Sequence, residues 1–98
     1  MQVNMETQNP LSSFFSAIEK DGRISCTHIG VYVSLVYCRV TKSFANPIQV
    51  FSHEIMELAK ISSPTTYFKC INDLNDYGYI VYKRSYNRKA ASKIYFLE

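Results

Sequence analysis

The longest apolar segment runs from Thr27 to about Ser43, and two structures compete for it. Its valines favour a strand, because β-branched side chains fit a pleated surface. A run of about 16 residues without a turn signal is long for a strand, however, and its apolar side chains recur at the spacing of one helical face. That face consists of Ile29, Tyr32, Val33, Val36, Tyr37, Val40 and Phe44, widened by Val31, Leu35 and Cys38. We therefore predict a central helix that other elements surround on nearly all sides.

The chain before this segment predicts a polar arm followed by a short helix. Residues 1–8 are polar and aperiodic, which is typical of a flexible arm. Asn9 is a suitable N-cap, and Pro10 suits the first turn, where its missing N–H forfeits no hydrogen bond. The apolar face of this helix consists of Phe14, Phe15 and Ile18. Asp21-Gly22 is expected to end it.

Two short helices are predicted in the middle of the chain. Asn46-Pro47 marks a turn, and residues 48–51 alternate like a short strand. Ser52 is then expected to cap a helix over about 53–60, with Glu54 in its first turn. The predicted inward face of this helix consists of Ile55, Met56, Leu58 and Ala59.

The next helix has clear start and stop signals. Ser63 is a suitable cap, Pro64 occupies the first helical position, and Gly78 marks the end. Its predicted inward side chains are Tyr67, Cys70, Ile71 and Leu74. Two short helices separated by about three residues form the signature of a helix-turn-helix.

A basic hairpin is predicted at the C-terminal end. Residues 79–83 and 93–97 are rich in β-formers, and a polar loop over 84–92 joins them. The order of the elements predicts an α+β, mainly α, fold. It comprises a three-helix core, an extra N-terminal helix and a two-stranded hairpin, all within one domain over residues 9–98.

Composition limits the class of protein. The 98 residues suffice for one domain, and 47% of them are hydrophobic, which indicates a folded chain. The three cysteines, Cys26, Cys38 and Cys70, lie in apolar runs without metal-ligand spacing, so we expect reduced thiols, a cytoplasmic location and neither a metal nor another cofactor. We find no leader peptide or membrane span, and no glycine-rich phosphate loop, paired carboxylates or nucleophile motif. A non-catalytic protein without a small-molecule ligand is therefore expected.

The net charge of +3 is mild, but its distribution is uneven. No acid lies between Asp76 and Glu98, a stretch that holds the basic residues Lys83, Arg84, Arg88, Lys89 and Lys93. One interpretation is a solvated hairpin that keeps a sheet edge soluble. The other is a surface for nucleic acid.

A family resemblance favours the second interpretation. The run from Ile61 to Ile80 resembles the recognition helix of winged helix-turn-helix regulators, with a small-residue start, a leucine four residues before Gly78, and Gly78-Tyr79-Ile80 leading into the wing. From Ile24 to Leu97 the chain is similar to small regulators associated with bacterial integrative and conjugative elements, which share Gly78-Tyr79-Ile80, Tyr86-Asn87 and Ser92-Lys93-Ile94. Ala91 stands where that pattern has glycine. The resemblance implies a regulator of transcription that binds double-stranded DNA.

The expected DNA-binding surface combines the recognition helix, about 64–77, with the wing, about 83–93. The outward face of the helix consists of Ser63, Thr65, Thr66, Phe68, Lys69 and Asn72, and the wing adds Tyr86 to its basic residues. Threonine, lysine and asparagine suit contacts with bases and phosphates in the major groove. Phe68 is a candidate for contact with a thymine methyl group, unless it belongs to the core. Asp73 and Asp76 are expected to repel phosphate, which limits the contact to the first two turns.

Three alternatives remain open from the sequence. The same fold can serve as a protein-interaction module, or as an accessory DNA-binding factor in replication or excision of a mobile element. A homodimer is also plausible, because winged-helix regulators often bind two-fold sites. Its candidate interface is the N-terminal helix with Phe14, Phe15 and Ile18; the alternative is that this helix only covers the core.

Overall fold

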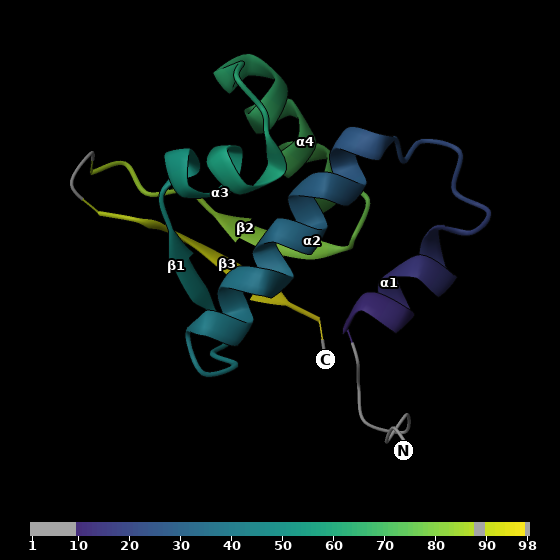
Figure 1. Ribbon diagram of the computed structural model, residues 1–98, viewed down its shortest axis with the longest axis horizontal. Helices are drawn as coiled ribbons and strands as arrows, with labels where there is room; N and C mark the ends of the chain where they lie inside the picture. The colour runs from purple at the N-terminus through teal and green to yellow at the C-terminus, as the bar shows by residue number, and fades with distance from the viewer. Residues whose placement is uncertain (1–9, 88–89, 98) are drawn as a thin grey trace.

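Four helices and three strands follow one another in the computed structural model, which describes residues 10–87 and 90–97 (Figure 1). They are α1 (Pro10–Ile18), α2 (Cys26–Thr41), β1 (Ile48–Val50), α3 (Ser52–Ala59), α4 (Pro64–Asp76), β2 (Ile80–Lys83) and β3 (Ser92–Phe96). The predicted mainly α-helical α+β class is confirmed. The arm predicted over residues 1–8 lies outside the described residues. None of the described helices is both long enough and apolar enough to cross a membrane.

The central helix is confirmed, and a reciprocal cap explains where it starts. The Ser25 hydroxyl accepts a hydrogen bond from the His28 backbone N–H at 3.4 Å, and the His28 Nδ1 accepts one from the Ser25 N–H at 2.9 Å. These bonds satisfy two backbone donors at the start of α2 that would otherwise lack partners.

The predicted buried face of α2 is wrong in part. Tyr32 and Val36 are buried, but four members of the predicted stripe are exposed: Val33, Tyr37, Val40 and Phe44. The buried side is instead completed by the residues that were expected only to widen the stripe, Val31, Leu35 and Cys38. The reason is that α2 packs on one side only. It crosses in front of the sheet in Figure 1, and no described element lies over its outer side.

Helix α1 covers the core through one aromatic ring. Phe14 is buried and stacks on Tyr32 of α2, with 3.9 Å between the ring centroids, and it makes a T-shaped contact with the ring of Tyr79. Ile18 is half-buried against the same core. Phe15 is 46% exposed, so the predicted three-residue face reduces to Phe14 and Ile18. Phe14 and Ile18 therefore cover the core, as one of the two alternatives for this helix expects.

Helix α3 starts one residue earlier than predicted and has a narrower buried face. Its N-cap is Phe51, whose N–H donates to the Glu54 carboxylate at 2.8 Å, so Ser52 is not the cap. Ile55 is fully buried, with Met56 and Ala59 packed beside it, but Leu58 is exposed. Ala59 approaches Gly30 of α2, and this close contact of the two helices turns Leu58 away from the core.

Helix α4 agrees with its prediction in detail. The Ser63 hydroxyl accepts a hydrogen bond from the Thr66 N–H at 3.2 Å, and Pro64 is the first helical residue. All four predicted inward side chains are buried: Tyr67, Cys70, Ile71 and Leu74. Gly78 follows the helix at φ +88°, a conformation that glycine adopts without strain.

The predicted two-stranded hairpin is part of a three-stranded antiparallel sheet with the order β1-β3-β2. Ile94 of β3 lies opposite Ile48 of β1 on one side and opposite Tyr82 of β2 on the other, so these side chains share a face. Ile48 and Ile94 are buried, which places this face against the helices. Strand β1 pairs with an edge of β3 that the hairpin alone would leave open.

Candidate functional site

The outward side chains of α4 lie where the sequence places them. Ser63, Thr65, Thr66, Phe68, Lys69 and Asn72 are all exposed. Phe68 is 38% exposed, and its ring meets the buried ring of Tyr67 edge-on. Phe68 is thus supported by the core without belonging to it, and its outer edge is available for contact.

A groove joins this face of α4 to the hairpin. Phe68 and Asn72 of α4 line it on one side, and Tyr82 and Arg84 line it on the other. It adjoins a hollow of about 280 Å³ that Phe51, at the start of α3, also lines. Residues from α4, from the start of α3 and from the β2–β3 hairpin therefore form one continuous surface.

The sequence analysis missed Tyr82 and Phe51 as members of this surface. Alternation along β2 would have indicated Tyr82, because Ile80 points to the core and every second residue shares its face. Arg84 follows Tyr82 by two residues, so the same alternation places it on the same face, and it also lines the groove. No periodic pattern in the sequence indicated Phe51, because its place beside the groove depends on how α3 packs against the rest of the domain.

The basic residues of the hairpin are divided between two faces. Lys83 and Lys93 are direct cross-strand partners, both are exposed, and they lie on the face of the sheet opposite to Ile94. Arg84 lies on the α4 side, where its guanidinium is 5.8 Å from the centre of the Tyr86 ring. Tyr86 itself is 92% exposed. The predicted contacts Arg88 and Lys89 lie outside the described residues.

Two lysines directly opposite each other repel, and this arrangement lowers the stability of the strand pair. The structure shows no ion pair of Lys83 or Lys93 with a carboxylate in the described part of the chain. An anion bound between the two ammonium groups would relieve the repulsion. This outer face is therefore electrostatically suited to a phosphate-rich ligand.

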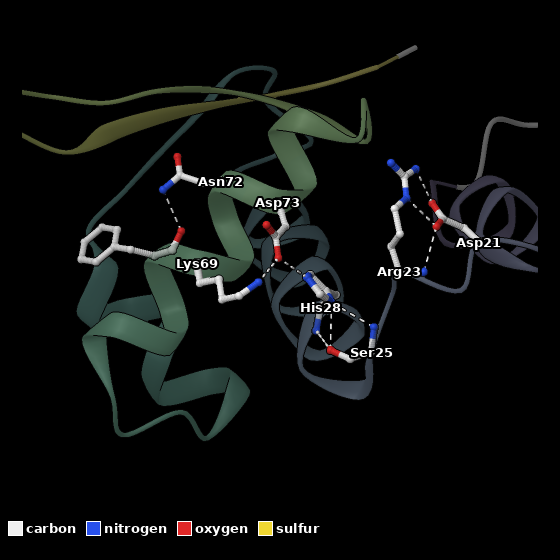
Figure 2. A network of polar contacts seen from close by, with 8 residues as sticks. Asp21, Arg23, Ser25, His28, Lys69, Asn72 and Asp73 are labelled. Carbon is white, nitrogen blue, oxygen red and sulfur yellow. Dashed lines mark hydrogen bonds and ion pairs between the residues drawn. The ribbon is translucent and has the colours of Figure 1, made fainter.

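A buried histidine connects α4 to α2. His28 has no metal-ligand spacing in the sequence, yet its Nε2 lies 2.9 Å from the Asp73 carboxylate, as Figure 2 shows. Because the other ring nitrogen accepts the Ser25 N–H, Nε2 is the nitrogen that donates to Asp73. The Lys69 ammonium contacts the same carboxylate oxygen at 2.9 Å. Asp73 therefore joins the start of α2 to the middle of α4.

These contacts change the electrostatics expected for the helix. The hydrogen bond from His28, followed by that from Lys69, lowers the pKa of Asp73 below its ordinary value. Asp73 in turn raises the pKa of Lys69. The sequence predicts that Asp73 repels phosphate. In the structure, hydrogen bonds from His28 and Lys69 partly offset the negative charge of Asp73. Conversely, Lys69 is not a free cation, because its ammonium is already paired.

Asn72 is also engaged within the helix. Its side-chain N–H donates to the Phe68 carbonyl at 2.8 Å, one turn earlier (Figure 2). The Ser63 hydroxyl is used as an acceptor by the helix cap. The side chains of Ser63, Lys69 and Asn72 are thus already used in contacts within the domain. In the described part of the chain, the exposed Thr65 and Thr66 hydroxyls and the exposed part of the Phe68 ring are not engaged in such contacts.

Among the described residues, no three His, Cys, Asp or Glu side chains lie close enough together to hold a metal ion. Comparisons with protein-family models, with curated protein sequences and with solved structures find no significant match.

Proposed function

We propose that the protein is a winged helix-turn-helix DNA-binding protein, in which α3 and α4 form the helix-turn-helix and β2–β3 form the wing. The observation that carries this proposal is the groove shared by α4 and the hairpin, which Phe68, Asn72, Tyr82 and Arg84 line. A recognition helix and a wing have to contact the same stretch of duplex, so their side chains must lie on one surface.

The N-terminal half of α4 is the part that suits the major groove. Its backbone N–H groups and its positive dipole end favour a phosphate, and Thr65 and Thr66 lie in the first turn. Phe68 follows one turn later with its ring edge exposed, where it can contact a thymine methyl group. Asp76 near the end of α4 disfavours phosphate, so the contact ends near Asn72.

The wing residues then have different roles. Arg84 faces the groove beside α4 and is placed to bind the strand that passes between helix and hairpin. Lys83 and Lys93 face away from α4 and reach only DNA that bends around the hairpin. Arg84 should therefore contribute more to affinity than either lysine, because arginine binds phosphate with two parallel hydrogen bonds.

We infer a regulator of transcription as the role of this DNA binding, in keeping with the resemblance of the 61–80 segment to recognition helices. The decisive experiment titrates the protein against its own upstream region and against a scrambled duplex of equal length. Binding of the upstream duplex at least about a hundredfold tighter supports a sequence-specific regulator. Equal binding of both duplexes would indicate an accessory or architectural factor. No binding at low salt would refute the DNA-binding proposal and favour a protein partner.

Two variants of equal charge test the docking surface. Arg84→Ala removes the guanidinium from the groove and should weaken binding by about 1–3 kcal/mol if that group contacts a base edge, and by less if it contacts a phosphate. Lys20→Ala removes one positive charge at an exposed position between α1 and α2 and serves as the control. Equal losses for the two variants would show that only net charge matters and would overturn the proposed surface.

A further inference from the structure

The face of the sheet that points away from the helices is basic. Successive side chains of a strand point to opposite faces, and the buried residues of each strand share the face of Ile94. In Figure 1, α2 crosses the sheet on that buried side. The residues between the buried ones form the outer sheet face, which in the described strands contains two lysines and no acid: Gln49, Val81, Lys83, Lys93 and Tyr95.

The strand register places three hydrogen-bond donors of this face in one row. Lys93 of the central strand lies opposite Lys83 on one side and opposite Gln49 on the other, and all three side chains are exposed. Neighbouring strands are about 4.8 Å apart, so the row extends roughly 10 Å across the sheet. Ammonium groups and an amide N–H group donate to phosphate oxygens. Such a row can hold a nucleic-acid backbone without reading its bases.

Protection of a sheet edge does not explain Lys93. Lysines on an edge strand prevent it from pairing with other chains. The strand order β1-β3-β2 makes β2 an edge, which accounts for Lys83, but β3 is central and is paired on both sides. Two lysines directly opposite each other also lower the stability of the strand pair. Lys93 therefore weakens the pairing without protecting an edge, which favours a role in binding an anion.

We propose that the outer sheet face binds the phosphate backbone of a second segment of duplex DNA, while α4 and Arg84 hold the first. This inference rests on the proposed function, which supplies the duplex at α4. One duplex reaches both surfaces only by bending around the hairpin, and bending a short duplex requires more free energy than two exposed lysine–phosphate contacts contribute. A second segment requires no bending. On a long DNA molecule it is also near, because binding at α4 raises the local concentration of neighbouring segments.

The side chains of the outer sheet face favour a duplex over a single strand. Proteins that bind single strands combine basic groups with exposed aromatic rings, on which the bases stack. The aromatic ring on this face belongs to Tyr95, which is half-buried, while the exposed polar groups are the phosphate-binding row of Gln49, Lys83 and Lys93. A duplex presents its phosphates on the outside, so this row can contact it without any base leaving the stack.

Energy transfer between two short duplexes joined by a flexible linker, one with a donor dye and the other with an acceptor dye, tests this bridge. Fluorescence anisotropy on one of these duplexes sets concentrations at which every protein molecule is bound. A bridge by one molecule should give the highest transfer at one protein per linked pair, and excess protein should lower it by occupying each duplex separately. Lys83→Gln combined with Lys93→Gln should leave the transfer at its protein-free value. Lys20→Gln combined with Lys42→Gln removes the same charge at exposed positions elsewhere and should preserve the bridge.

The two proposals fail in different ways. If a single duplex binds but the linked pair shows no rise in transfer, the second segment is refuted and the proposed function stands; absence of any DNA binding refutes both. A rise that persists at two proteins per linked pair shows that two protein molecules pair, and it also overturns the bridge. Two further substrates identify other occupants: dyes on the ends of one uninterrupted duplex report bending, and a linked single strand replaces the second duplex. A rise with one of these but not with the linked duplexes overturns the proposal. Circular dichroism verifies that the double variant is folded, and Lys93→Gln alone replaces it if it is not.

Discussion

At the residue scale, Asp73 joins two helices through one carboxylate. It accepts hydrogen bonds from the buried ring of His28 and from the exposed ammonium of Lys69. Asp73 and His28 are 45 residues apart, so this contact contributes to the packing of α4 against α2.

We expect Asp73→Asn to lower the free energy of unfolding at pH 7 by on the order of 1 kcal/mol, the usual size of such a hydrogen bond. The pKa of Asp73 is lowered in the folded state. Its stabilisation is therefore present above the unfolded pKa of about 3.9 and is lost as the pH falls through the folded value. Urea unfolding of variant and wild type should differ at pH 7 and converge in stronger acid. Asp76→Asn is the control, and a difference that persists unchanged in acid would contradict this role.

The same substitution should have the opposite effect on DNA affinity. Asp73→Asn removes an acid from α4 and releases the Lys69 ammonium for phosphate, so we expect binding to tighten roughly three- to tenfold. Fluorescence anisotropy with a labelled duplex measures this. If Asp73→Asn instead weakens binding while Asp76→Asn does not, α4 does not approach DNA through Lys69.

At the element scale, the orientation of α4 is the feature on which the proposed site depends. Leu74 is fully buried, while Thr65 on the same helix is exposed. Leu74→Ala should lower the free energy of unfolding by about 2–5 kcal/mol, because it leaves a cavity in the core. Thr65→Ala should change it little. Thermal and urea unfolding measure both, and similar values would mean that the helix is rotated from the orientation described.

The turn between α3 and α4 offers a second test at this scale. Lys60 ends α3 at φ +62°, in the left-handed region, and its N–H donates to the Met56 carbonyl. A glycine adopts this conformation without the crowding of a Cβ atom. Lys60→Gly should therefore raise the free energy of unfolding by roughly 0.5–1 kcal/mol. Lys20→Gly, outside the four helices, provides a comparison, and a loss of stability at Lys60 would refute the strain argument.

At the scale of the whole molecule, the proposed function predicts a strong dependence on salt. Each phosphate contact releases a counterion, so a docking surface that uses Arg84 and the outer Lys83 and Lys93 should give a log–log slope of about −3. Arg84→Ala should make the slope less steep by about one unit. A slope near zero would mean that the protein does not bind the DNA backbone.

The agreement between sequence and structure varies from element to element. For α4, the Ser63 cap, Pro64 and four well-spaced apolar residues determine both the start and the buried face. For α2, apolar residues surround the helix axis, so the pattern predicts a helix but gives little contrast between its sides. Leu58 shows the same limit in α3, where the close approach of Ala59 to Gly30 decides the orientation. Expectations of DNA binding, dimer formation and the absence of catalysis stay predictions.

The sequence by itself determined the order of the elements, the α+β class and the outward side chains of α4, because caps and helical periodicity act over a few neighbouring residues. Tertiary structure alone decided that β1 joins β3, that His28 meets Asp73, and that Arg84 lies beside α4 while Lys83 faces away. Each of these depends on segments far apart in the chain packing against one another. Only that packing, which buries one side of α2 and leaves the other open, determines which surfaces remain for a partner.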